Sequence, residues 1–290
     1  MKTVDSLHNS NPFKRILFGF AFSPSLENNL HEVVRLAHFF GSELILLHVG
    51  EKTDEKSSKV ERIVAATATP ERVKEYHWIS GDPYQVIKES TTTLAINLLV
   101  LGAMQHESIV RFYLGSVARK LTRSVSCSVL LLIKPAIERV ACKHVVVSGM
   151  DTPQTPTTLF QAFYAAQSLG SNQITVVEEI ANKTVKISVE DDRSLLRSLR
   201  KKNALEAEEG RRVKRLIEQL PALLTKDLPV VNQPIFGRRG YSIGHYAEVV
   251  RADLLVMGAP SSSSIITRIF TRDIEYILSD LPSDLLICRE

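Results

Sequence analysis

A loop that begins with a glycine after an apolar run and ends in Gly-Ser at a helix start is the clearest candidate for chemistry in this sequence. The run Leu98–Leu101 ends at Gly102, and Gly115-Ser116 opens the next helical pattern. A glycine at the end of a strand lets a ligand approach the backbone closely. The N–H groups and the dipole of a helix N-terminus favour a phosphate or another anion. The spacing therefore predicts an anion-binding loop at residues 102–118, with the serine hydroxyl as a further donor.

The other reactive residue types do not form a catalytic or metal-binding pattern. His48 ends an apolar run, but no Ser or Cys with a basic neighbour accompanies it, as nucleophilic catalysis would require. Cys127, Cys142 and Cys288 lack the spacing of metal ligands or of a disulfide framework. We therefore expect no catalytic residue, no metal ligand and a non-enzymatic function, with ATP hydrolysis as the remote alternative.

The composition is that of a folded protein with about two domains. The chain has 290 residues, of which 44% are hydrophobic and 23% charged, and domains usually contain about 100–200 residues. The formal net charge of +4 is too small to demand a polyanionic partner, so we expect no nucleic-acid binding. No apolar run approaches the ~18–20 residues of a membrane span. We expect a cytoplasmic protein without a membrane span.

The elements that must position the loop occur twice along the chain. The segment Asn97–Ala103 reappears as Asp253–Ala259. Residues 136–142 lie between the two copies and form the predicted linker. The repeat predicts two domains of the same fold at residues 13–135 and 143–290, called the first half and the second half below.

Each half alternates apolar strands with helices. The strands are almost continuous in Val, Leu and Ile, which is typical of strands covered on both faces. Helical patterns between such strands imply right-handed crossovers and an open parallel sheet with helices on both faces, the α/β class. In the first half the expected strands are 15–22, 43–49, 74–80, 98–102 and 128–134, and the expected helices are 25–40, 83–95 and 115–124.

The second half is longer because of a charged segment at residues 185–224. Basic and acidic residues are interspersed along it, which argues against a surface of a single sign. We expect a helix, broken near Gly210, whose apolar residues pack on the sheet while its charges face water. These apolar residues are Leu195, Leu199, Leu216, Ile217 and Leu220. One alternative is a surface for a nucleic acid or an acidic partner, and another is that the segment binds a protein partner.

Short phrases in a fixed order resemble the universal stress protein family. They are Leu46–Val49 at a strand end, Leu98–Gly102 with its copy Leu254–Gly258, Gly115–Ala118 at a helix start and Cys127–Leu130 at a strand start. Over about residues 13–290 the chain is similar to a tandem of two such domains. The resemblance implies a stress-response function as a nucleotide-sensing or adaptor module.

The resemblance also implies a topology and a mode of pairing. Each half would be an open parallel five-stranded sheet of order 3-2-1-4-5, which is Rossmann-like and similar to the adenine nucleotide alpha hydrolases. The two domains would pair along their fifth strands within the chain, and a homodimer would be a further level of assembly. One subclass of the family holds ATP with the pattern G-x2-G-x9-G-(S/T) and an acidic residue at the end of the first strand.

Transfer of that site to this sequence leaves a more complete site in the first half. Its residues there are Val49, Gly102, Gln105, Gly115, Ser116 and Val117, with Gln105 in place of the second glycine and Ala21 in place of the acid. In the second half they are Asp151, Gly258, Ser261, Thr271 and Arg272, with Met150 in place of the acid. We expect weak binding of ATP, with Mg²⁺, in the first half and a degenerate site in the second. The alternative is a regulatory scaffold that binds a protein and no nucleotide.

Overall fold

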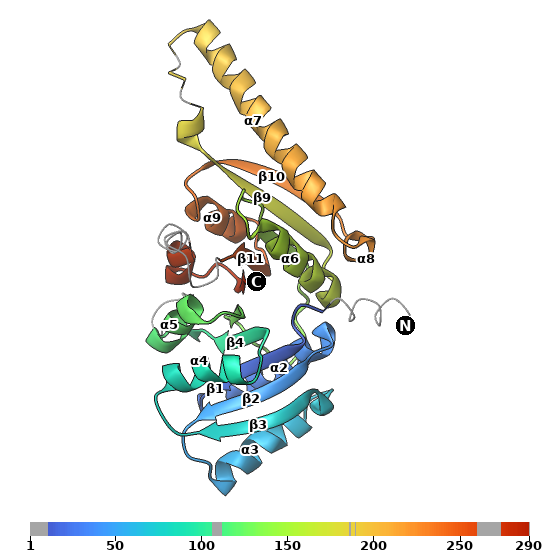
Figure 1. Cartoon of the computed structure of the whole chain (residues 1–290), viewed down its shortest axis with the longest axis vertical. Helices are drawn as coiled ribbons and strands as arrows, with labels where there is room; N and C mark the ends of the chain where they lie inside the picture. The colour runs from blue at the N-terminus through green and yellow to red at the C-terminus, as the bar shows by residue number, and fades with distance from the viewer. Residues whose placement is uncertain (1–10, 106–111, 186, 189, 260–273, 290) are drawn as a thin grey trace.

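The computed structural model describes residues 11–105, 112–185, 187–188, 190–259 and 274–289 (Figure 1). Its central feature is one sheet of ten strands in the order β10-β9-β8-β11-β12-β7-β4-β1-β2-β3. The strands are β1 (Arg15–Phe20), β2 (Glu43–Val49), β3 (Val73–Ile79), β4 (Leu98–Gly102), β7 (Ser128–Leu132), β8 (His144–Ser148), β9 (Gln173–Ala181), β10 (Val230–Gly237), β11 (Leu254–Gly258) and β12 (Asp284–Cys288). A separate ribbon pairs β5 (Met104–Gln105) with β6 (Phe112–Tyr113).

Helices cover both faces of the sheet, which confirms the predicted α/β class. They are α2 (Leu26–Phe40), α3 (Asp54–Ala65), α4 (Pro83–Thr93), α5 (Ser116–Ser124), α6 (Thr155–Leu169), α7 (Asp192–Glu218), α8 (Ala222–Thr225) and α9 (Tyr241–Val249). Ile16 and Phe18 belong to the apolar cluster formed with α2, α3, α6 and α7, whereas Leu17 belongs to the cluster formed with α4, α5 and α9. No helix in the described part of the chain is long and apolar enough to cross a membrane.

Local signals in the sequence determine where these helices begin and end. α2 and α6 end at Gly41 and Gly170, whose φ angles of 63° and 71° lie in the left-handed region that glycine favours. α4 begins with Pro83, and the side chain of Asp82 before it accepts a hydrogen bond from the backbone N–H of Gln85. These caps set the points at which the chain leaves each helix for the next strand.

The sheet differs from the prediction of two separate sheets. β7 and β12, the fifth strands of the two halves, pair antiparallel, with Leu131 opposite Leu285 and Val129 opposite Ile287. Both strands are apolar and buried, and an unpaired apolar edge would be open to association. The order within each half is the one that the resemblance implies, but the two sets of five strands share one sheet.

Buried polar side chains connect the halves beside this strand pair. The guanidinium of Arg289, a residue that is 7% exposed, donates to the backbone carbonyls of Thr122 and Cys127. Gln161 on α6 donates to the Arg289 carbonyl at 2.9 Å and accepts from Ser128 Oγ at 2.8 Å. The junction between the halves is therefore both apolar and hydrogen-bonded.

The charged segment of the second half forms a single unbroken helix, α7, which is less buried than predicted. The helix continues through Gly210 without a break. Leu216 and Ile217 pack against the core as predicted, but Leu195 and Leu199 are 44% and 47% exposed. Figure 1 shows the reason, because the N-terminal end of α7 extends beyond the sheet.

Candidate functional site

The predicted anion site of the first half is the loop between β4 and α5. Gly102 ends β4, and Ser116 begins α5 with Gly115 as its N-cap. β5 and β6 pair across the loop, which turns the chain back toward α5. Residues 106–111 lie outside the described part of the chain, and only the backbone of Gln105 is described.

The N-terminus of α5 has the properties that an anion site needs. No side chain caps it, because its N-cap is Gly115, and its first turn has no acidic residue. Within that first turn, the N–H groups and the dipole therefore have no competing carboxylate. Val117 packs against the core next to Leu121, which holds the helix start on the sheet.

Asn29 on α2 lies against the glycine that ends β4. A Cβ atom at Gly102 would lie 3.1 Å from Asn29 Oδ1. Asn29 is 7% exposed, and its Nδ2 donates to Ser25 O at 2.8 Å, whereas its Oδ1 accepts no hydrogen bond from any described residue. Such an acceptor is stabilised by any donor that reaches it. The sequence signal is a polar residue in the apolar stripe of α2, between Leu26 and Leu30.

Four rings lie at the carboxyl ends of β1, β2 and β3, and we call Phe20, Phe22, His48 and Trp78 the aromatic cluster. Phe20 stacks on His48 at 5.4 Å between ring centroids, and Phe22 stacks on Trp78 at 6.2 Å. His48 Nδ1 lies 3.1 Å from Phe20 O. His48 therefore packs within the cluster, and Val49 follows it, partly buried, at the end of β2.

Two of the predicted site residues of the second half are described, Asp151 and Gly258. Asp151 follows β8, and its side chain is 81% exposed. Gly258 ends β11, where a Cβ atom would lie 2.2 Å from Thr158 Oγ1 on α6. The glycine is therefore required for the packing of α6, whatever ligand the site takes. Ser261, Thr271 and Arg272 lie outside the described residues.

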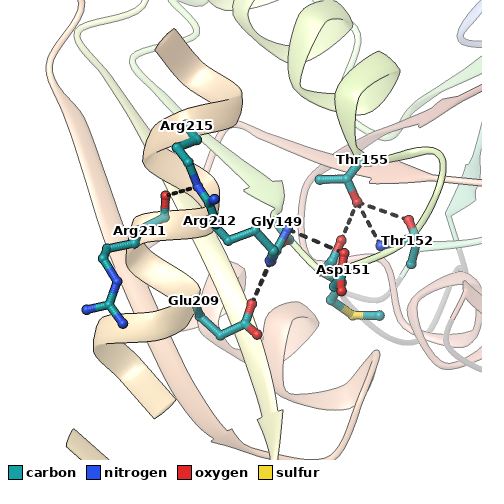
Figure 2. Close-up of polar contacts among 9 residues, drawn as sticks. Gly149, Asp151, Thr152, Thr155, Glu209, Arg211, Arg212 and Arg215 are labelled. Atoms are coloured by element: carbon teal, nitrogen blue, oxygen red, sulfur yellow. Dashed lines mark hydrogen bonds and ion pairs between the residues drawn. The ribbon is translucent and has the colours of Figure 1, made fainter. Parts of the chain in front are cut away.

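Arg212 on α7 bridges to the strand end of the second half (Figure 2). Its guanidinium donates to Gly149 O and, at 2.8 Å, to Glu209 Oε2 on the same helix. It also lies 4.0 Å from Asp151 Oδ1. These contacts hold α7 over the end of β8, where the ligand site of an open parallel sheet is expected.

The same position differs between the two halves. In the first half, Phe20 on β1 is opposite His48 on β2. In the second half, Gly149 and Glu178 directly follow the last registered pair of β8 and β9, so they are the corresponding residues. A phenyl ring in the first half thus takes the place of Gly149 in the second. A Cβ atom there would come within 3.3 Å of Val213 on α7. Gly149 lets α7 approach the strand end of the second half. The carboxyl group of Glu178 takes the place that the imidazole of His48 has in the first half.

Glu178 has an unusual environment for a carboxyl group. The residue is 1% exposed, and neither of its carboxyl oxygens has a hydrogen-bond partner among the described residues. Burial, and to a lesser extent the charge of Glu209, raise the pKa of Glu178 to about 7, although Arg212 opposes this shift. The sequence pattern does not single out Glu178, and its only signal is an acidic pair that ends an apolar strand.

Comparison with known proteins finds a family match for the first half. Residues 12–132 match the model of the Universal stress protein family. This part of the chain is therefore similar to a universal stress protein domain. The match includes Val49, Gly102 and Gly115, and ends at the last residue of β7. No curated protein matches the chain.

Solved structures share the fold over nearly the whole chain. A universal stress protein from Archaeoglobus fulgidus matches with a TM-score of 0.64 and 15% identity, covering 95% of this chain and 98% of that chain. A functionally unknown protein from Pseudomonas aeruginosa matches with a TM-score of 0.67 and 15% identity, covering 97% and 94%. A universal stress protein in complex with cAMP covers 42% of this chain and 97% of its own, with a TM-score of 0.34 and 21% identity. The first two likenesses show the fold of the chain.

Proposed function

We propose that this chain is a non-enzymatic, nucleotide-responsive module of the cytoplasmic stress response. The first half binds the nucleotide, and the second half, residues 143–290, is a second domain of the same family that acts as its structural partner. The supporting observation is the asymmetry of the two strand ends. In the first half the N-terminus of α5 is uncapped, whereas Arg212 holds α7 over the strand end of the second half.

The phosphates and the adenine of ATP would contact two different parts of the first half. Its phosphates would accept hydrogen bonds from the N-terminus of α5 and from the Ser116 hydroxyl. Its adenine would stack on the partly exposed rings of Phe22 and Trp78 in the aromatic cluster. Ala21 stands where the resemblance implies an acid, so Mg²⁺ would enter only with the phosphates. Because Ala21 supplies no carboxylate contact, we expect the affinity for ATP to be weak.

Gly115→Asp tests the position of the phosphates. Asp is a favoured N-cap, so the variant retains α5 while its carboxylate repels a phosphate. A ligand at 100 times its Kd adds about 2.7 kcal/mol of stability, and we expect Mg-ATP to raise the Tm of the wild type but not of this variant. Gln154→Asp at the N-cap of α6 is the matched control and should keep the ATP response. Absence of saturable binding of ATP at millimolar concentration would contradict the proposal.

Exposed leucines on α7 favour a second candidate function, a regulatory scaffold that binds a protein and no nucleotide. Leu195, Leu196 and Leu199 are 44%, 52% and 47% exposed. Leu195 and Leu199 share one helix face because they are four residues apart, and clustered exposed apolar residues mark interaction surfaces. We expect Leu195→Gln with Leu199→Gln to abolish capture of the partner by the full chain, and Arg200→Gln to retain it. Retained capture by the leucine variant would exclude this surface.

A further inference from the structure

Four carboxylates surround a pocket of about 230 Å³ at the carboxyl ends of β8 and β9. We call this the acidic pocket, and its carboxylates are Asp151, Glu178, Glu179 and Glu209. Arg239 also lines it. Figure 2 shows the side where α7 meets the strand end, with Glu209 and Asp151 on either side of Arg212.

Three of these carboxylates have hydrogen bonds, an ion pair or solvent that stabilise their negative charge. Glu179 accepts hydrogen bonds at 2.9 Å from the backbone N–H groups of Gly240 and Ile243 at the start of α9. Glu209 is bound to Arg212, and Asp151 is exposed to solvent and lies 4.0 Å from the same guanidinium. Glu178 differs, because it is 1% exposed and, in the part of the chain that the structure describes, neither oxygen has a hydrogen-bond partner. A buried carboxylate without a donor is unstable unless it binds a proton or a cation.

The volume and the lining residues of the acidic pocket limit the kind of cation that it can bind. Its volume is below the roughly 300–1,000 Å³ of sites for drug-sized ligands, so a nucleotide does not fit. Met150, Ile180 and Leu205 supply apolar surface beside the carboxylates. No group of three or more His, Cys, Asp or Glu among the described residues could hold a metal ion.

We propose that the acidic pocket binds a small organic cation, an ammonium or guanidinium group on a short alkyl chain. The N–H groups of the cation donate to the Glu178 carboxylate, which supplies a charge-assisted hydrogen bond. The alkyl chain lies against Met150 and Leu205. This site is in the second half and is independent of nucleotide binding in the first.

Because Glu178 carries a proton in part of the molecules near pH 7, cation binding should release protons and depend on pH. Burial, together with the facing Glu209, raises the pKa of Glu178 to about 7 against the opposing Arg212. Asp151, Glu179 and Arg239 are the other charged groups that line the pocket. A bound cation stabilises the carboxylate and lowers this pKa, so binding near pH 7 releases a proton. Affinity therefore rises as the pH increases from 6 to 8.

Isothermal titration of the full chain with butylammonium and with butylguanidinium tests the proposal, with 1-butanol as the neutral probe. We expect both cations to bind, 1-butanol not to bind, and proton release to appear as a dependence of the heat on the ionisation enthalpy of the buffer. Glu178→Gln should weaken cation binding by about 10- to 100-fold and remove the proton release. Glu208→Gln, the same change at an exposed position of α7, should leave both unchanged.

Other results would overturn the proposal. Equal binding of 1-butanol would show an apolar pocket only, and saturable binding of Mg²⁺ or Ca²⁺ with no organic cation would show a metal site. Cation binding that is unaffected by Glu178→Gln would place the ligand elsewhere. Leu205→Trp fills the pocket from α7 without altering a carboxylate. It should abolish cation binding, so the proposal stays testable even where the glutamine variant fails to fold.

Discussion

At the scale of single residues, two buried acceptors distinguish the strand ends of the halves. Asn29 Oδ1 in the first half and the Glu178 carboxyl in the second lack hydrogen-bond partners within residues 11–105, 112–185, 187–188, 190–259 and 274–289. A neutral amide can remain in such a place at every pH, whereas a buried carboxylate is costly enough to take up a proton. We therefore expect the first site to respond to hydrogen-bond donors, and the second to respond to protons and cations.

Glu178→Gln separates the charge of this residue from its shape. The pKa of about 7 in the folded protein lies above the ordinary value of 4.5, so the folded chain keeps a proton that the unfolded chain loses between these values. The stability that protonated Glu178 supplies is complete below about pH 4.5 and is lost as the pH rises through about 7. We expect Glu178→Gln to equal the wild type near pH 4.5 and to exceed it by roughly 1–3 kcal/mol at pH 8, measured by urea unfolding.

Glu208→Gln is the control for this comparison, because its side chain is exposed. It should follow the wild type at every pH. A stability difference between Glu178→Gln and the wild type that stays constant from pH 4.5 to 8 would show that Glu178 does not titrate in this range.

At the scale of elements, two glycines act in opposite ways on α7. Gly210 lies inside the helix, and a Cβ atom there meets only Asn232 Nδ2, at 3.8 Å. Gly149 lies under the helix, where a Cβ atom would be 2.5 Å from Val176 Cγ1. We expect Gly210→Ala to stabilise the chain by about 0.5–1 kcal/mol and Gly149→Ala to destabilise it by about 1–3 kcal/mol.

Urea unfolding of both alanine variants measures these changes. A Gly149→Ala variant as stable as the wild type would show that Val176 on β9 and Val213 on α7 do not pack closely on this position. A destabilised Gly210→Ala variant would show that α7 needs a flexible position at its centre.

Local patterns predicted the repeated elements well and the contacts between them poorly. β4 and β11 have the bounds of the two repeated segments, Leu98–Gly102 and Leu254–Gly258, because an apolar run and a terminal glycine are local signals. The exposure of Leu195 was not predictable, because an apolar spacing does not reveal whether a sheet lies beneath that part of a helix. The same limit applies to Glu178, whose environment depends on α7, a segment distant in the sequence.

The residues of the candidate site likewise include some that local sequence signals predict and some that only tertiary contacts place there. Gly102 and Gly115 follow from a strand end and a helix start, which are both local. Asn29 belongs to the site only because α2 crosses β4, and Arg212 only because α7 returns over β8. Tertiary contacts of this kind leave no periodic signal in a single sequence.

At the scale of the whole molecule, the pairing of β7 with β12 decides which surfaces remain for association. A homodimer through the fifth strands is excluded by the pairing within the chain. The edge strands β3 and β10 remain, where Tyr76 and Val230 are 39% and 38% exposed. We expect any dimer seen by sedimentation equilibrium to be weakened by Tyr76→Lys or Val230→Lys on one of these edges. A dimer that neither substitution affects would have to use another face.

The shared sheet also predicts that the two halves unfold together. Each apolar cluster contains residues of both halves, and Arg289 at the end of β12 bonds to the carbonyls of Thr122 and Cys127. We expect one calorimetric transition with equal calorimetric and van't Hoff enthalpies. Arg289→Met leaves those carbonyls without a donor and should lower stability by about 1–3 kcal/mol, whereas Arg251→Met at an exposed position should not. Two transitions in the wild type would mean that the halves are energetically independent despite the common sheet.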